Sequence, residues 1–135
     1  MTDLSMDKGE LEAALEQWLD EGESVVAGAG AMTGSQVWGP TSMLAKWCYI
    51  GVTQTRVVVL SLSRWSTRVK GVWFEDPRDG VVAGAVAWGN PWNTFMYQRP
   101  DGTSLRMNFH RFWRNEMEEV LEALGAPMPP ASGGS

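Results

Sequence analysis

Residues 44–74 read LAKWCYIGVTQTRVVVLSLSRWSTRVKGVWF, and this stretch decides the fold class. Apolar and polar residues alternate through much of it, and the consecutive valines at 57–59 are β-branched, as pleated sheets favour. A period of two residues is typical of β-strands. We therefore predict three strands in this stretch, at about 44–52, 55–62 and 67–74.

The same period of two extends on both sides of this stretch, between residues 24 and 109. Tight-turn residues interrupt it, most clearly at Pro100-Asp101-Gly102, where proline presets φ and glycine accepts a positive φ. Gly89-Asn90-Pro91 similarly separates two strands. Four further strands are predicted, at 24–31, 80–88, 93–99 and 103–109, and they bring the total to seven.

Amphipathic helices are predicted at both ends of this strand-rich region. The first, over about 7–21, has an acidic face and an apolar stripe of Leu11, Ala14, Leu15, Trp18 and Leu19, whose spacing is that of one helix face. The second, over 111–124, ends before Gly125. Its stripe is Phe112, Trp113, Met117, Val120, Leu121 and Leu124. We assign Trp18 and Trp113 to the core.

The composition indicates one globular unit divided into three segments. Hydrophobic residues make up 44% and charged residues 20% of the 135 residues, which is ordinary for a globular domain. We expect an acidic helix packed on the domain at 1–23, the main domain at 24–125, and a disordered tail rich in Pro, Gly and Ser at 126–135. The acidic N-terminal sequence does not resemble a signal or transit peptide, so we expect a cytoplasmic protein.

The charge is distributed unevenly along the chain. The formal net charge is −5, yet residues 24–74 contain Lys46, Arg56, Arg64, Arg68 and Lys70 and no acid. A protein that binds nucleic acid generally has a basic field over much of its surface, which this composition does not provide. We therefore expect no nucleic-acid partner, but a local basic surface around residues 46–70.

The residues that carry most enzymatic chemistry are scarce in this chain. Cys48 is the only cysteine and lies in an apolar run, so we interpret it as a buried, inert thiol. His110 is the only histidine, and its place between a predicted strand and helix suits a hydrogen bond to a free backbone group. Zinc sites and Cys-His nucleophiles need clustered partners. The sequence thus predicts no catalytic residues, metal site or cofactor, and the protein is not expected to be an enzyme.

The order of elements, seven strands and then one amphipathic helix, resembles the pleckstrin-homology superfold. Two local features resemble the bacterial PH-like domains: an acidic leading helix that ends in Gly22-Glu23, and a hairpin turn at 51–55 that leads into Arg56 and the aliphatic run 57–60. The resemblance covers about residues 10–124. It implies a mainly β (α+β) fold, a seven-stranded bent antiparallel barrel capped by the C-terminal helix, here with an extra N-terminal helix.

The resemblance also implies a binding function rather than a reaction, because PH-like domains bind phosphoinositides, peptides or other proteins. The basic pattern of lipid-binding members is missing from the loop 32–43, which contains no Lys or Arg. The leading hypothesis is a protein partner or a homo-oligomer. The alternatives are a weak sensor of anionic lipid headgroups and a barrel that binds a small molecule on its tryptophans.

Candidate contact residues come from loop tryptophans and from the acid-free half of the chain. Large aromatic and arginine side chains are enriched where proteins bind each other. We therefore predict a partner-binding surface from Trp38, Arg64, Trp65, Arg68, Lys70 and Trp92. Two arrangements remain open for its basic hairpin at 63–70: the acidic helix 7–21 covers it within one molecule, or an acidic partner does so.

Overall fold

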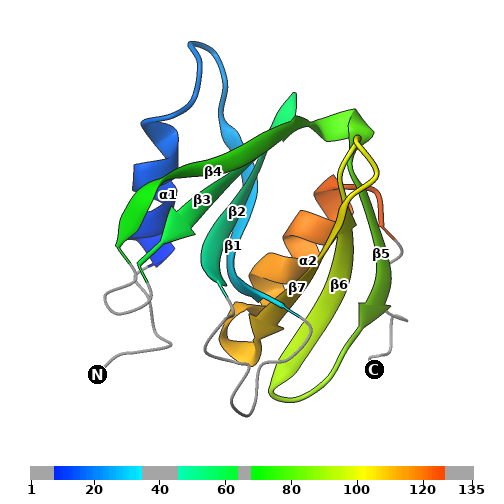
Figure 1. Cartoon of the computed structure of the whole chain (residues 1–135). Helices are drawn as coiled ribbons and strands as arrows, with labels where there is room; N and C mark the ends of the chain where they lie inside the picture. The colour runs from blue at the N-terminus through cyan, green and yellow to red at the C-terminus, as the bar shows by residue number, and fades with distance from the viewer. Residues whose placement is uncertain (1–7, 35–45, 64–67, 127–135) are drawn as a thin grey trace.

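A computed structural model, which describes residues 8–34, 46–63 and 68–126, shows a seven-stranded antiparallel sheet with two α-helices (Figure 1). The strands are β1 (Val25–Thr33), β2 (Lys46–Thr53), β3 (Arg56–Leu62), β4 (Val69–Pro77), β5 (Val82–Ala87), β6 (Trp92–Gln98) and β7 (Ser104–His110). The helices are α1 (Lys8–Glu16) and α2 (Arg114–Ala123), and two 3₁₀ turns are η2 (Arg78–Gly80) and η3 (Arg111–Trp113). All seven predicted strands and the mainly β class are confirmed.

The strands form one sheet in the order β4-β3-β2-β1-β7-β6-β5. β1 joins two groups of consecutive strands: it pairs with β2 along most of its length but with β7 only through Met32 and Thr33. The turn predicted at 100–102 is confirmed, since Gly102 adopts a φ of +94° and its amide donates to the carbonyl of Arg99 at 2.9 Å. Antiparallel pairing of consecutive strands thus forms each group, and the β1–β7 pairing unites them.

Side chains connect strands that are distant in the sheet order, so the sheet bends over on itself. Asp76 of β4 accepts a hydrogen bond from the Tyr97 hydroxyl of β6 at 2.9 Å and pairs with Arg99 at 3.1 Å. The rings of Phe74 and Tyr97 meet edge to face, 5.7 Å between centroids. The described ladders end at β4 and at β5. The bend is therefore a feature of the structure, and closure into a barrel stays a prediction.

Helix α2 crosses the centre of the fold between the two groups of strands (Figure 1). Its buried residues are Met117, Val120 and Leu121, which share the core with the apolar side chains of the sheet. Gly125, with a φ of +76°, ends the helix as predicted: its amide donates to the Glu122 carbonyl, and the Ala126 amide donates to the Leu121 carbonyl. These two bonds form a Schellman cap.

Helix α1 packs on the sheet but ends five residues earlier than predicted. Leu11 and Leu15 are buried as expected, and Leu15 lies where any side chain on Gly51 would stand. The prediction that Trp18 belongs to the core is wrong, because its side chain is 44% exposed. The chain leaves the helix after Glu16, and the Trp18 carbonyl instead accepts a hydrogen bond from Arg56 at 2.7 Å.

The start of the C-terminal helix also differs from the prediction. Residues 111–113 form the 3₁₀ turn η3, whose three-residue period turns successive side chains differently from an α-helix. Trp113 is buried as predicted, whereas Phe112 is 36% exposed and does not continue the buried stripe. Residues 127–135 of the predicted disordered tail lie outside the described residues. No helix in the described ranges is long and apolar enough to cross a membrane.

The packing of α2 predicts a large effect of truncating its central apolar side chain. Leu121→Ala removes a completely buried side chain and leaves a cavity, so the free energy of unfolding should fall by about 2–5 kcal/mol in chemical denaturation. The neighbouring Glu122 is exposed, and Glu122→Ala should change the same quantity by no more than about 0.5 kcal/mol. Similar values for both variants would show that α2 is not part of the core.

Candidate functional site

The structure separates the residues predicted to contact a partner. Arg68 and Lys70 are exposed at the start of β4, as the prediction requires. Trp92 lies at the start of β6, is half-buried, and has its ring edge-on to His110 at 5.4 Å. It belongs to the other group of strands and is not shown beside the basic residues. Trp38, Arg64 and Trp65 lie outside the described residues.

A row of basic residues comes together at one end of the sheet, and we call it the basic rim: Lys46, Arg68, Lys70 and Arg106. Lys46 begins β2 and pairs with Thr33 at the end of β1. Arg68 precedes β4, and its carbonyl accepts the amide of Ser63, just beyond the end of β3, at 2.7 Å. The Arg106 carbonyl accepts the amide of Gly34 at 3.2 Å, which brings β7 to the same end.

The basic rim has no acidic partner among the described residues. Its side chains form none of the ion pairs that the structure records there. The ammonium of Lys46 lies 4.3 Å from the ring centroid of Trp73. The rim crosses the strands from β4 to β7, which at the usual strand spacing is about 20 Å. Four positive charges thus remain available to an external anionic group.

The other basic side chains in the described part of the chain are engaged inside the molecule. Each contacts an acid, a backbone carbonyl or a side-chain amide: Lys8 with Glu116, Arg56 with Glu23, Arg78 with the Ala123 carbonyl, Arg99 with Asp76, Arg111 with Asn90, and Arg114 with Glu118. Among the described residues, the rim therefore differs from the other basic side chains in its lack of a hydrogen-bonded or acidic partner and not simply in its charge.

The acidic N-terminal segment is held at the opposite end of β3 from the rim. Glu23 binds the Arg56 guanidinium through two bonds of 2.9 Å, and Arg56 also pairs with Glu75. The hydroxyl of Thr53 donates to Glu23 at 2.6 Å. These bonds hold the acidic segment at the first residue of β3, whereas the rim lies at the end of that strand. Among the described residues, no ion pair therefore supports the arrangement in which the first helix covers the basic hairpin.

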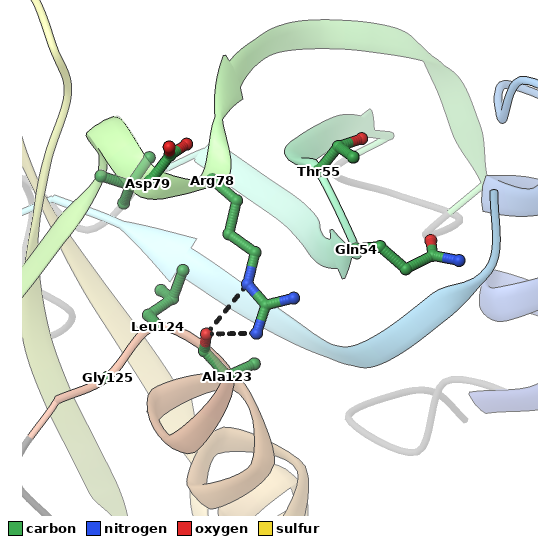
Figure 2. Close-up of a pocket in the computed structure, with 8 residues that line it drawn as sticks. Gln54, Thr55, Arg78, Asp79, Ala123, Leu124 and Gly125 are labelled. Atoms are coloured by element: carbon green, nitrogen blue, oxygen red, sulfur yellow. Dashed lines mark hydrogen bonds between the residues drawn. The ribbon is translucent and has the colours of Figure 1, made fainter.

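A pocket of about 530 Å³ opens at the C-terminal end of α2 (Figure 2). Arg78 lies in its wall and donates to the Ala123 carbonyl through Nε and a terminal nitrogen, at 3.0 and 2.7 Å. Its other terminal nitrogen donates to the Thr53 carbonyl at 3.0 Å. A cation at this position complements the partial negative charge of a helix end. Arg78 therefore connects α2 to the β2–β3 turn, which is a structural role.

The two residues considered for catalysis, Cys48 and His110, lie on different strands. Cys48 is fully buried on β2, and burial raises the pKa of its thiol to about 12. His110 ends β7, and its Nδ1 accepts the amide of Phe112 at 3.2 Å, as predicted. Burial and the neighbouring Arg111 lower the His110 pKa. Among the described residues no group of three or more His, Cys, Asp or Glu side chains is arranged to hold a metal ion.

Sequence reasoning missed one member of the basic rim. Arg106 lies 36 positions beyond Lys70 in the chain and is flanked by apolar residues on a strand of its own. Only the pairing of Thr33 with both Lys46 and Met107 places β7 at this end of the sheet. No local signal indicates that pairing.

Comparison with known proteins adds no constraint: no family model matches the chain, and no curated protein matches it.

The Glu23–Arg56 pair predicts a loss of stability in acid. Hydrogen bonds from Arg56 hold the pKa of Glu23 at about 2, against 4.5 ordinarily, so between these values the unfolded chain binds the extra proton. The free energy of unfolding should therefore fall as the pH drops through that range. Denaturation at neutral and acidic pH should show that Glu23→Gln removes this part of the dependence, whereas Glu122→Gln retains it. An unchanged pH dependence in Glu23→Gln contradicts the assignment.

The burial of Cys48 predicts that its thiol is inert in the folded protein. A thiolate is the reactive form, and a pKa of about 12 leaves little of it at neutral pH. Labelling by an aromatic disulfide reagent should proceed no faster than unfolding, and should become rapid in denaturant. Stoichiometric labelling within seconds in native buffer would show that the thiol is accessible.

Proposed function

We propose that this chain is a non-enzymatic interaction module of the PH-like type, and that its basic rim binds an acidic surface on a partner protein. One observation carries the proposal: Lys46, Arg68, Lys70 and Arg106 meet at one end of the sheet without an acid partner among the described residues. Complementary charge steers association and selects partners, and rim charges mainly affect its rate and salt dependence.

The overall charge favours a compact acidic partner over a long polyanion. With a net charge of −5, the rest of the surface repels a nucleic acid that extends beyond the rim. A protein surface of about the length of the rim avoids that repulsion. A second copy of the chain also offers exposed acids, among them Asp20, whose side chain is 86% exposed. Contact between the rim of one copy and the acids of another would be head to tail.

Anionic lipid headgroups are the second candidate ligand for the same rim. Each basic residue near a membrane surface contributes about 1 kcal/mol, and salt screens that contribution within a Debye length. Half-buried Trp47 and Trp73 lie on the two strands that begin at the rim, where an interfacial aromatic is useful. The negative net charge opposes this binding, which should therefore be weak and confined to acidic membranes.

Single charge reversals test the rim. Lys70→Glu and Arg106→Glu should each weaken binding to an immobilised glutamate-rich helical peptide by about 2- to 5-fold at low salt, the size expected for one exposed charge. Arg111→Glu makes the same change in net charge away from the rim and should have little effect. The melting temperature should stay nearly unchanged in all three variants, because these side chains are exposed.

The controls separate the candidate ligands. Sedimentation of the protein alone reports self-association, and co-sedimentation with phosphatidylserine vesicles reports lipid binding. Binding to the vesicles but not to the peptide, lost in the same two variants, would favour the lipid candidate over the protein partner. If Arg111→Glu weakens peptide binding as much as Lys70→Glu does, the effect comes from net charge alone and the rim is not the site.

A further inference from the structure

The pocket at the C-terminal end of α2 contains chemical groups that the fold does not use. Its volume is about 530 Å³, and it lies between the β2–β3 turn, η2 and the end of α2 (Figure 2). Arg78, Asp79 and Val81 line it from η2 and the residue after it, and Leu124 lines it from the end of α2. Sites for small organic molecules have volumes of this order. The pocket is therefore large enough for such a ligand.

The guanidinium of Arg78 has hydrogen-bond donors beyond those that hold the fold together. A guanidinium carries five N–H groups. Three of them donate in the bonds already described, two to the Ala123 carbonyl and one to the Thr53 carbonyl. Two N–H groups of Arg78 are thus unused in the bonds recorded among the described residues, and they belong to a side chain in the pocket wall.

The charge of Arg78 also lacks an acid, which distinguishes it from comparable arginines. Four arginines of the described residues are half-buried. Three of them pair with an acid: Arg56 with Glu23, Arg99 with Asp76, and Arg114 with Glu118. Arg78 forms none of the ion pairs recorded there, and its hydrogen-bond acceptors are neutral carbonyls. A partly desolvated guanidinium with unused donors favours a carboxylate, which accepts two parallel N–H bonds.

A simple anion would not suit the rest of the pocket, because its other polar groups are negative. Asp79 follows Arg78 on η2, is exposed, and forms none of the ion pairs recorded among the described residues. The last carbonyls of α2 add the partial negative charge of a helix C-terminus. These groups repel a carboxylate and attract an ammonium. A ligand that carries both charges is therefore favoured over one that carries either charge alone.

The wall between these polar groups is apolar. Val81 is 5% exposed and belongs to the core, and the half-buried side chains of Ala123 and Leu124 pack against that core. These three residues line the same pocket as Arg78. Apolar surface that a ligand covers here is removed from water, which is favourable. The wall consequently favours an apolar group on the ligand.

We infer that this pocket binds a free α-amino acid with an apolar side chain. Its carboxylate accepts the two unused N–H groups of Arg78, its ammonium faces Asp79 and the carbonyls at the end of α2, and its side chain packs on Val81 and Leu124. The inference is independent of the basic rim, because it concerns other residues and a ligand without net charge.

Leucine is the probe, and the full-length, ¹⁵N-labelled protein provides the readout. Leucine should move the backbone amide resonances of Asp79, Leu124 and Gly125 saturably. Leucinamide, which lacks the carboxylate, and 4-methylpentanoate, which lacks the ammonium, should each bind at least about tenfold more weakly, the effect of losing hydrogen bonds to a charged group. Glycine should also bind more weakly, because it leaves the apolar wall uncovered. Equal affinities for leucine and glycine would overturn the assignment of the side chain.

Two variants and a matched control test the same site from the protein side. Asp79→Asn breaks none of the recorded bonds and should weaken leucine binding by about 2- to 5-fold at an unchanged melting temperature. Glu122→Gln removes the same charge from an exposed acid outside the pocket wall and should leave the affinity unaltered. Arg78→Lys keeps the charge but loses the parallel N–H groups, and should weaken binding by at least about tenfold. Because Arg78→Lys also removes bonds to α2, its binding is measured well below its melting temperature.

The outcomes that overturn the proposal are distinct from those that concern the rim. Pocket resonances that leucine does not move, or an affinity for leucine unaltered in both Asp79→Asn and Arg78→Lys, would show that the pocket holds only water. N-acetyl-leucine, which resembles the last residue of a peptide, should bind no better than 4-methylpentanoate. If it binds as tightly as leucine, the pocket recognises a chain terminus and the proposed contact of the ammonium with Asp79 is wrong.

Discussion

The shape of the molecule depends on the hydrogen bonds and the ion pair that the Asp76 carboxylate forms with Tyr97 and Arg99. Asp76 is 6% exposed, yet it is satisfied by the Tyr97 hydroxyl and by the guanidinium of Arg99, which also lies 4.3 Å from the Phe74 ring. Asp76 lies on β4, whereas Tyr97 lies on β6 and Arg99 directly follows it. Four strands separate β4 from β6 in the sheet order, so these bonds require the sheet to curl around the core. A buried carboxylate without its partners would cost free energy, so this contact favours the bent arrangement over others in which Asp76 would be buried and unpaired.

The curled sheet can accept two helices because its central strands carry glycine where those helices approach. Gly51 leaves space for Leu15 of α1, and Gly30 leaves space for Trp113 at the start of α2. Any larger residue at these positions would meet a buried side chain at 2.1 and 2.8 Å, respectively. The two helices consequently come close enough for Lys8 to contact Glu116. A cleft of about 220 Å³, lined in part by Lys8, Trp113 and Glu116, lies between the two helices and β1.

Acidic and basic side chains are separated more clearly in the structure than along the sequence. The acids of the N-terminal segment and of β4 surround Arg56 at one end of β3, and the basic rim lies at the other end without acid partners among the described residues. The paired end stabilises the fold, and the basic rim is the end that we propose as the binding surface.

The sequence by itself determined the seven strands, the two helices, the turn at 100–102, and the buried state of Cys48, because each depends on residues within a few positions of each other. It also predicted the exposure of Arg68 and Lys70, which follows from their polar surroundings. Only the tertiary structure decided that Arg106 joins these residues and that Trp18 is exposed. The first depends on the register between β1 and β7, and the second on the end of α1 at Glu16, after which the Trp18 carbonyl accepts a hydrogen bond from Arg56 of a distant strand. Contacts between residues far apart in the chain have no local signature, so periodicity cannot reveal them.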